Sequence, residues 1–284
     1  MELTIQQPCT ALEALKKLYP DSSRRTLQNW LRAGRFYADG KAITRENEQL
    51  LAGQTIHAQT TCKPQLIPGL KVLYEDRYCI AIDKPEGLLS VPLDTNEQKR
   101  HALGLLRNHF DTDQIFAAHR IDRETSGCLL FAKGKESERR FDELFEKHDL
   151  QRTYFAIVQG RVSPSQGTWK SRLLELESLK VVESADGREA ITHYKTLRRS
   201  PKYTYLLCTL ETGRKHQIRV HCSSAGCPIL GDGRYGSTED PIQRMCLHAL
   251  RLELIHPFTK QKLSLHSPLP SSFKKLALNE CLSL

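Results

Sequence analysis

The sequence predicts an α+β protein with two domains, and three observations support this fold class. After residue 70, runs of β-branched and aromatic residues are separated by turn residues, which predicts many short strands. Helical patterns interrupt these strands without the regular alternation of a doubly wound sheet. Proline and glycine within residues 63–69 indicate a linker. We therefore expect a small domain over residues 1–62 and a larger domain over residues 70–284.

The small domain is expected to contain two helices and a hairpin. An apolar stripe over residues 12–18, ended by Pro20, predicts a short amphipathic helix. A second helix is expected from the Ser22-Ser23 cap to a stop at Gly34. The following Asp39-Gly40 predicts the turn of a hairpin.

The larger domain is expected to be rich in strands. Two helical patterns stand out, one over residues 137–148 with Phe141, Leu144 and Phe145 on one face, and one over residues 215–225. The predicted strands cover residues 72–74, 78–83, 128–132, 153–159, 169–176, 190–197 and 203–210.

The composition is that of a globular protein, with 39% hydrophobic and 26% charged residues. No apolar run approaches the roughly 18 residues that a membrane span needs, so no membrane partner is expected. The N-terminus has no secretory pattern, which predicts a cytoplasmic protein. Nine scattered cysteines form no CxxC pair and are expected to be reduced thiols.

The chain is basic, with a formal net charge of +9. The segment from Lys195 to Val220 contains seven lysine and arginine residues but only one acidic residue, Glu211. A local field of one sign favours a polyanionic partner, because phosphate neutralisation releases counterions. We therefore expect RNA or DNA as a partner.

Two polar segments stand out as candidates for chemistry. In the segment HRIDRETSG over residues 119–127, Asp122 lies in a loop that enters an apolar strand. Taken alone, an aspartate in such a loop is more often a structural residue that caps the turn or pairs with Arg120 or Arg123. In TGRKHQIRVH over residues 212–221, the helical pattern turns Arg219 away from the apolar stripe. Arg219 is therefore placed to reach a carboxylate.

These segments resemble the two main signatures of the RluA family of RNA pseudouridine synthases. Four further stretches are similar to motifs of that family, in the family's order along residues 70–260. Two positions depart from the pattern, Ile121 where leucine is commoner and Arg152 where lysine is usual. The four stretches are KPEGLLSVP over 84–92, RTYFAIVQG over 152–160, GCPILGDGRYG over 226–236 and LHALRLELIHP over 247–257.

The resemblance implies a mixed, mainly antiparallel sheet with flanking helices and a cofactor-free isomerase. Asp122 would be the catalytic carboxylate, either as a nucleophile or in proton transfer at the sugar. Arg219 would keep this carboxylate ionised. Tyr154 would stack on the target uracil after the uridine has left its stack. No metal and no cofactor are expected.

The resemblance also implies residues that contact RNA. The first domain is similar to an S4-type RNA-binding domain, and the alternative is a small helical appendage that only packs against the rest of the protein. Arg120 resembles the family residue that can fill the place of the flipped base. The full set of expected RNA contacts is His119, Arg120, Arg214, Lys215, His216, Lys84, Arg24, Arg25, Arg32 and Arg35.

Other functions fit the sequence less well. The GxGxxG pattern over residues 231–236 lacks a βαβ context, and His216, His221, Cys222 and Cys227 fit no zinc spacing. The alternative from a different class is a non-catalytic protein that binds RNA or assists ribosome assembly. Within the enzyme class, we expect large-subunit ribosomal RNA as the substrate of a monomeric enzyme, with transfer RNA as the alternative.

Overall fold

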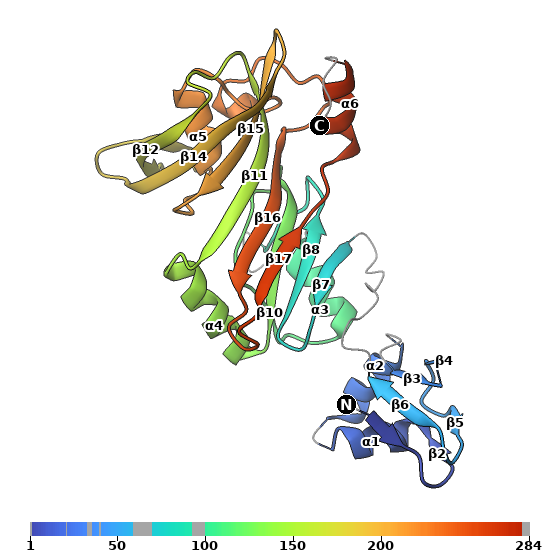
Figure 1. The fold of residues 1–284 in the computed structure, drawn as a ribbon. Coiled ribbons are helices and arrows are strands. Elements are labelled where there is room, and N and C mark those ends of the chain that lie inside the picture. The colour runs from blue at the N-terminus through green and yellow to red at the C-terminus, as the bar shows by residue number, and fades with distance from the viewer. Residues whose placement is uncertain are drawn as a thin grey trace. The chain divides into compact units, whose positions relative to one another are not determined.

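A computed structural model describes residues 2–20, 22–32, 36–39, 41–58, 70–92 and 100–279 (Figure 1). The chain divides into two compact units, one of residues 1–67 with 75–77 and one of residues 68–74 with 78–284. The linker expected over residues 63–69 lies outside the described residues. Each unit is described by itself.

The N-terminal unit is a small α+β fold. Its first helix begins at a capping box, in which Thr10 and Glu13 exchange hydrogen bonds. The Ser23 hydroxyl accepts from the Thr26 amide and caps the second helix. The predicted stop at Gly34 and the turn residue Gly40 lie outside the described residues. Four strands form a sheet in the order β1-β6-β3-β4, and β2 pairs with β5. The elements are β1 (Glu2–Thr4), β2 (Cys9–Thr10), α1 (Ala11–Leu18), α2 (Arg24–Arg32), β3 (Phe36–Ala38), β4 (Lys41–Ile43), β5 (Gln49–Leu50) and β6 (Thr55–Ala58).

The larger unit is built on an eleven-stranded sheet. Its strands follow the order β13-β12-β14-β15-β11-β16-β10-β8-β7, with β17 on β16 and β9 on β10. The registers are antiparallel except for the parallel pair of β10 and β16, so the expected mixed, mainly antiparallel sheet is confirmed. The strands are β7 (Lys71–Glu75), β8 (Cys79–Lys84), β9 (Ile115–Ala117), β10 (Ser126–Lys133), β11 (Leu150–Gln159), β12 (Gln166–Glu175), β13 (Val181–Glu183), β14 (Arg188–Arg199), β15 (Tyr203–Leu210), β16 (Leu247–Ile255) and β17 (Lys262–His266).

Helices cover parts of this sheet. α4 packs on β10 and α5 packs on β12 and β14, towards the two ends of the long strand β11 (Figure 1). Phe141 of α4 is fully buried on the sheet, as the predicted apolar face requires. In this unit two helices, α3 and α6, and four strands, β9, β13, β16 and β17, were not predicted. The helices are α3 (Ala102–Phe110), α4 (Lys135–Glu146), α5 (Gln217–Ser224) and α6 (Ser271–Asn279), with a 3-10 turn η1 (Gly233–Tyr235).

The parallel contact of β10 with β16 depends on Gly127. Its φ is +115°, and a Cβ added there would lie 2.2 Å from the carbonyl oxygen of Ala249. Beside it, the Ser126 hydroxyl lies 2.8 Å from Nδ1 of His248, and Nη2 of Arg244 donates to the same hydroxyl at 2.8 Å. Buried polar groups therefore join the start of β10 to β16 at the point where the glycine lets the strands approach.

Replacing Gly127 with alanine is expected to lower the free energy of unfolding by at least about 3 kcal/mol, since strain at positive φ adds to a backbone clash. Gly87→Ala is the matched control, because Gly87 also has a positive φ of +76° but has nothing within 4 Å of the added Cβ. That variant is expected to lose only about 1 kcal/mol. Urea titrations followed by circular dichroism measure both, and equal losses would contradict the role given to the close approach.

Candidate active site

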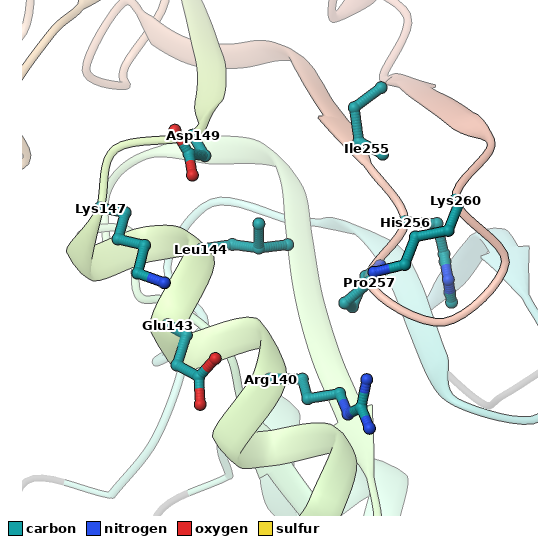
Figure 2. Close-up of a pocket in the computed structure, with 9 residues that line it drawn as sticks. All are labelled: Arg140, Glu143, Leu144, Lys147, Asp149, Ile255, His256, Pro257 and Lys260. Atoms are coloured by element: carbon teal, nitrogen blue, oxygen red, sulfur yellow. The ribbon is translucent and has the colours of Figure 1, made fainter.

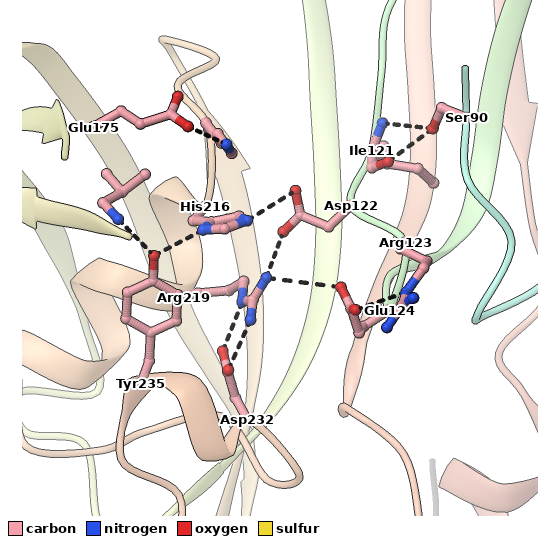
Figure 3. Close-up of polar contacts among 12 residues, drawn as sticks. Ser90, Ile121, Asp122, Arg123, Glu124, Glu175, His216, Arg219, Asp232 and Tyr235 are labelled. Atoms are coloured by element: carbon pink, nitrogen blue, oxygen red, sulfur yellow. Dashed lines mark hydrogen bonds and ion pairs between the residues drawn. The ribbon is translucent and has the colours of Figure 1, made fainter. Parts of the chain in front are cut away.

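Asp122 lies in the loop between β9 and β10, and hydrogen bonds hold this loop in place. The Ser90 hydroxyl donates to the carbonyl of Ile121 at 2.7 Å and accepts from its amide at 3.2 Å (Figure 3). The Thr125 amide donates to the carbonyl of Asp122 at 3.1 Å. The Asp122 side chain keeps 21% of its surface exposed. The carboxylate is thus fixed by its backbone and still accessible.

Lys84 lies in the fold and not on the RNA-binding surface that was expected for it. The side chain is fully buried, and Nζ donates to the carbonyl oxygens of Pro85, Leu88 and Arg123 at 3.0, 2.7 and 3.1 Å. Burial lowers the pKa of this ammonium to about 7, against the opposing effect of the Asp122 charge. These three bonds use its hydrogens, so Lys84 has none left for a phosphate. It joins β8 to the Asp122 loop instead.

Arg219 links two carboxylates. Its Nη1 lies 3.1 Å from Oδ2 of Asp122, while Nε and Nη2 donate to Oδ2 and Oδ1 of Asp232 at 2.7 and 2.8 Å (Figure 3). Burial opposes the charge of this guanidinium, but its hydrogen bonds to Asp232 and the charge of Asp122 leave its pKa raised. The bidentate pair fixes the plane of the guanidinium. The helical pattern predicts that Arg219 can reach a carboxylate and the resemblance implies that this is Asp122; the contact between the two is present.

His216 approaches the other oxygen of Asp122. It adopts a left-handed conformation, with φ of +55°, at the start of α5. Its Nε2 lies 3.9 Å from Oδ1 of Asp122, and its Nδ1 lies 2.7 Å from the Tyr235 hydroxyl, which accepts from the Val181 amide. Burial lowers the pKa of His216. A neutral imidazole whose Nδ1 accepts a hydrogen bond from the Tyr235 hydroxyl carries its own hydrogen at Nε2, which points towards Asp122.

Tyr154 lies on β11 with only 9% of its surface exposed. Burial raises the pKa of its phenol to about 12, and the charge of Asp122 acts in the same direction. The phenol is therefore neutral at physiological pH. Ala249 of β16 pairs with both Tyr154 and Gly127, so the register of the sheet brings Tyr154 close to the strand that follows the Asp122 loop.

The other side chains that were predicted to contact RNA differ in whether they are free to do so. The Leu130 amide donates to Nε2 of His119 at 3.1 Å, and the His119 ring stacks on Phe145, so this side chain already has partners within the fold. Burial lowers its pKa to about 3. Arg120 is exposed, and Lys215 forms an ion pair with Glu175. Arg120 is thus the exposed basic side chain closest in sequence to Asp122 on its N-terminal side.

The arginines predicted in the N-terminal unit are only partly described. Arg24 is 71% exposed and lies 3.4 Å from Glu46. The side chains of Arg25 and Arg32 and the whole of Arg35 lie outside the described residues. Their contact with RNA stays a prediction.

Sequence reasoning missed Asp232 and Tyr235, which hold Arg219 and His216. Both belong to the stretch GDGRYG, which fits a GxGxxG pattern and a motif of the family but gives neither side chain a role. An acidic residue beside glycines gives no sign that it will be 1% exposed against an arginine. The positions become meaningful only once η1 is placed beside α5.

The described residues also form a cavity of about 510 Å³ elsewhere in the larger unit. It lies between α4 and the turn that follows β16, and no predicted site residue lines it (Figure 2). Its lining mixes both charges with apolar side chains, from Arg140, Glu143, Leu144, Lys147, Asp149, Ile255, His256, Pro257 and Lys260.

Comparison with known proteins identifies the family. Residues 78–224 match the family model described as RNA pseudouridylate synthase. The chain belongs to the RNA pseudouridine synthase family. Its curated relatives include a ribosomal large subunit pseudouridine synthase D of Nitrosomonas europaea, which is 35% identical over 302 residues, or 97% of this chain and 86% of the relative. The protein of the same name from Xanthomonas campestris pv. campestris is 33% identical over 287 residues, or 92% of this chain and 86% of the relative.

Solved structures agree with this assignment. Human RNA pseudouridylate synthase domain containing 4 superposes with a TM-score of 0.62 at 25% identity, covering 75% of this chain and 94% of that one. Human RNA pseudouridylate synthase domain containing 1 gives a TM-score of 0.61 at 24% identity, covering 73% and 86%, and shows the shared fold. The resemblance of this pseudouridine synthase to the RluA family, and with it the predicted class of an isomerase that acts on RNA, is confirmed.

No helix in the part of the chain that the structure describes is long and apolar enough to cross a membrane.

Replacing Asp232 with asparagine is expected to lower the free energy of unfolding by about 3 kcal/mol, because the buried Arg219 loses one of its two charged partners. Glu124→Gln is the matched control, since Glu124 lies 4.0 Å from the same guanidinium but is 42% exposed. The control is expected to change stability by less than about 0.5 kcal/mol. Urea unfolding measures both variants, and similar effects would argue against a dominant Asp232–Arg219 pair.

Proposed function

We propose that this chain converts particular uridines in RNA to pseudouridine, with Asp122 as the catalytic carboxylate. The observation that carries the proposal is the chain of contacts from Asp232 through Arg219 to Asp122, with Tyr154 two strands from the start of β10, in a member of this family. A protein that only binds RNA has no need of an accessible carboxylate facing a polyanion. The arrangement favours the enzyme over the binding protein.

The reaction assigns a part to each group. The N1–C1′ bond of uridine breaks, a C5–C1′ bond forms, and the proton lost from C5 is balanced by one gained at N1. Asp122 acts either as nucleophile or in proton transfer at the sugar. Arg219 orients its carboxylate, and the neutral Tyr154 ring stacks on the uracil. The base must first leave its stack, and Arg120 is proposed to fill the vacated place. The isomerisation needs neither a redox step nor added energy, so the proposed mechanism uses no cofactor, and none of its steps calls for a metal.

The proposed substrate is large-subunit ribosomal RNA. The relatives named ribosomal large subunit pseudouridine synthase D support this substrate, because they align with more than nine tenths of this chain. Such a substrate would place the enzyme in the cytoplasm, and we propose that it works there as a monomer. Transfer RNA is the alternative substrate.

We also propose that residues 1–62 form an S4-like RNA-binding domain, joined by residues 63–69 to a catalytic domain over residues 70–284. The described N-terminal unit supports this proposal through two short helices beside a small sheet. Its basic side chains would then anchor RNA, while Arg214, Lys215 and His216 would contact it near Asp122.

The decisive experiment compares the wild type with Asp122→Asn, which removes the charge at nearly constant shape. Both proteins are incubated with ribosomal RNA and transfer RNA that lack pseudouridine, and the modified positions are mapped. The wild type is expected to form pseudouridine at defined positions, and the variant to be slower by at least about a thousandfold.

Binding separates a catalytic role from a structural one. Asp122→Asn is expected to bind the same RNA within about threefold of the wild type, because the aspartate supplies no attraction for phosphate. Pseudouridine formation in transfer RNA alone would support the alternative substrate. RNA binding without pseudouridine formation by the wild type would favour the non-catalytic protein.

The N-terminal domain is tested by the double variant Arg24→Ala/Arg25→Ala. Its RNA affinity is expected to fall, and the slope of log affinity against log salt to decrease by about 0.7 to 0.9 for each lost phosphate contact. Lys17→Ala/Lys41→Ala removes the same charge from exposed positions of the same unit. Filter binding over a salt series measures both variants. Equal slopes would show that only the net charge of the unit matters, and would contradict phosphate contacts by Arg24 and Arg25.

A further inference from the structure

Arg152 is a partly buried arginine for which the part of the chain that the structure describes supplies no acidic partner. It lies on β11 two residues before Tyr154, so the two side chains project from the same face of the strand. Its Nε is buried and has no hydrogen-bond partner. Among the described residues, no carboxylate forms an ion pair with its guanidinium. A buried guanidinium nitrogen without a partner is unfavourable. An anion bound to Arg152 would therefore stabilise this position.

The surroundings of Arg152 add positive charge. Arg214 lies close enough that its charge lowers the pKa of Arg152, in addition to the larger effect of burial. Nε of Arg214 donates to the carbonyl of Glu189 at 2.9 Å, which fixes that side chain. The acidic residue at the end of β15, Glu211, lies 3.1 Å from His193. Two guanidinium groups are thus held near each other, and the nearby acid has a different partner.

Gly213 leaves the space that the Arg152 guanidinium occupies. A Cβ added at residue 213 would lie 2.1 Å from Nη1 of Arg152 and 3.0 Å from its Cζ. Any side chain at residue 213 would therefore push the guanidinium out of this position. The turn that carries Arg214 therefore packs directly against the guanidinium of Arg152.

We propose that Arg152 and Arg214 bind a phosphodiester group of the RNA substrate, adjacent to the nucleotide that stacks on Tyr154. This inference rests on the proposed function and names the part of the substrate that the two arginines recognise. The planar guanidinium matches the geometry of a phosphate, and the anion would supply the charge that Arg152 lacks. The spacing of Arg152 and Tyr154 along one face of β11 places the phosphate next to the flipped base.

Three variants test the site on an RNA oligonucleotide in which the wild type forms pseudouridine. Arg152→Met removes the charge and is expected to raise KM about tenfold while kcat stays within about threefold, because a phosphate contact away from the reacting atoms contributes uniform binding. Arg152→Lys keeps the charge and is expected to recover part of the loss. Gly213→Ala keeps the charge but displaces the flexible guanidinium, so it is expected to raise KM as well.

The matched control is Arg139→Met, which removes one positive charge from the exposed face of α4. It is expected to leave KM within about twofold, since the charge lies outside the proposed site and is screened by salt. A KM change as large as that of Arg152→Met would show that only net charge matters, and would overturn the proposal.

Uncharged methylphosphonate linkages, placed one at a time around the target uridine, identify the phosphate. At one linkage the substitution is expected to raise KM for the wild type but to add little for Arg152→Met, because the same contact is already lost. If the effects of the methylphosphonate and of Arg152→Met on KM are additive at every linkage, Arg152 contacts none of these phosphates and the proposal is overturned. A fall in kcat at constant KM would also overturn it, and would assign Arg152 to the positioning of Tyr154.

The proposed function can fail separately. If the wild type forms no pseudouridine in any RNA, the proposed function is wrong. The phosphate site is then tested by measuring the equilibrium affinity for the same oligonucleotides, with the same comparison of linkages. Equal affinity of the wild type, Arg152→Met and Gly213→Ala would then overturn it.

Discussion

The guanidinium of Arg219 is the group on which the rest of the site depends. It is 5% exposed, and the two carboxylates that flank it come from segments far apart in the chain, Asp122 before β10 and Asp232 before η1. Because a buried charge must be paired, the helix α5, the Asp122 loop and the turn at η1 can reach their positions only together. Accessibility then distinguishes the two acids, since Asp232 is 1% exposed and Asp122 is 21% exposed.

A second set of interactions fixes the loop itself. Ser90 binds both backbone groups of Ile121, and Lys84 joins β8 to the carbonyl of Arg123. The loop therefore has little freedom, although it carries an accessible carboxylate. This combination of a fixed backbone and an open side chain suits chemistry that needs one geometry. The polar residues near Asp122 thus serve mainly to hold it, and the basic residues farther out remain for RNA.

The sequence predicted much of the fold and the centre of the site. The strand over residues 203–210 follows from its local pattern, and the helical pattern leaves Arg219 able to reach a carboxylate. The resemblance to the family named Asp122 as that carboxylate, and the two side chains lie 3.1 Å apart. β16 was not predicted, because its Leu, Ala and Glu residues favour helices and only its neighbours in the sheet make it a strand. The burial of Lys84 and the partner of Arg219 depend on packing between distant segments, which no local pattern encodes.

The parallel pairing of β10 with β16 joins residues that are 122 positions apart, as in the contact of Ser126 with His248. Such long-range pairing makes folding slow, because a large loop must close before its contacts stabilise it. During synthesis the Asp122 loop leaves the ribosome well before β16 does. Activity therefore emerges only when nearly the whole chain has been translated, and a truncated chain that contains every residue up to Asp232 would still lack the strand that anchors the start of β10.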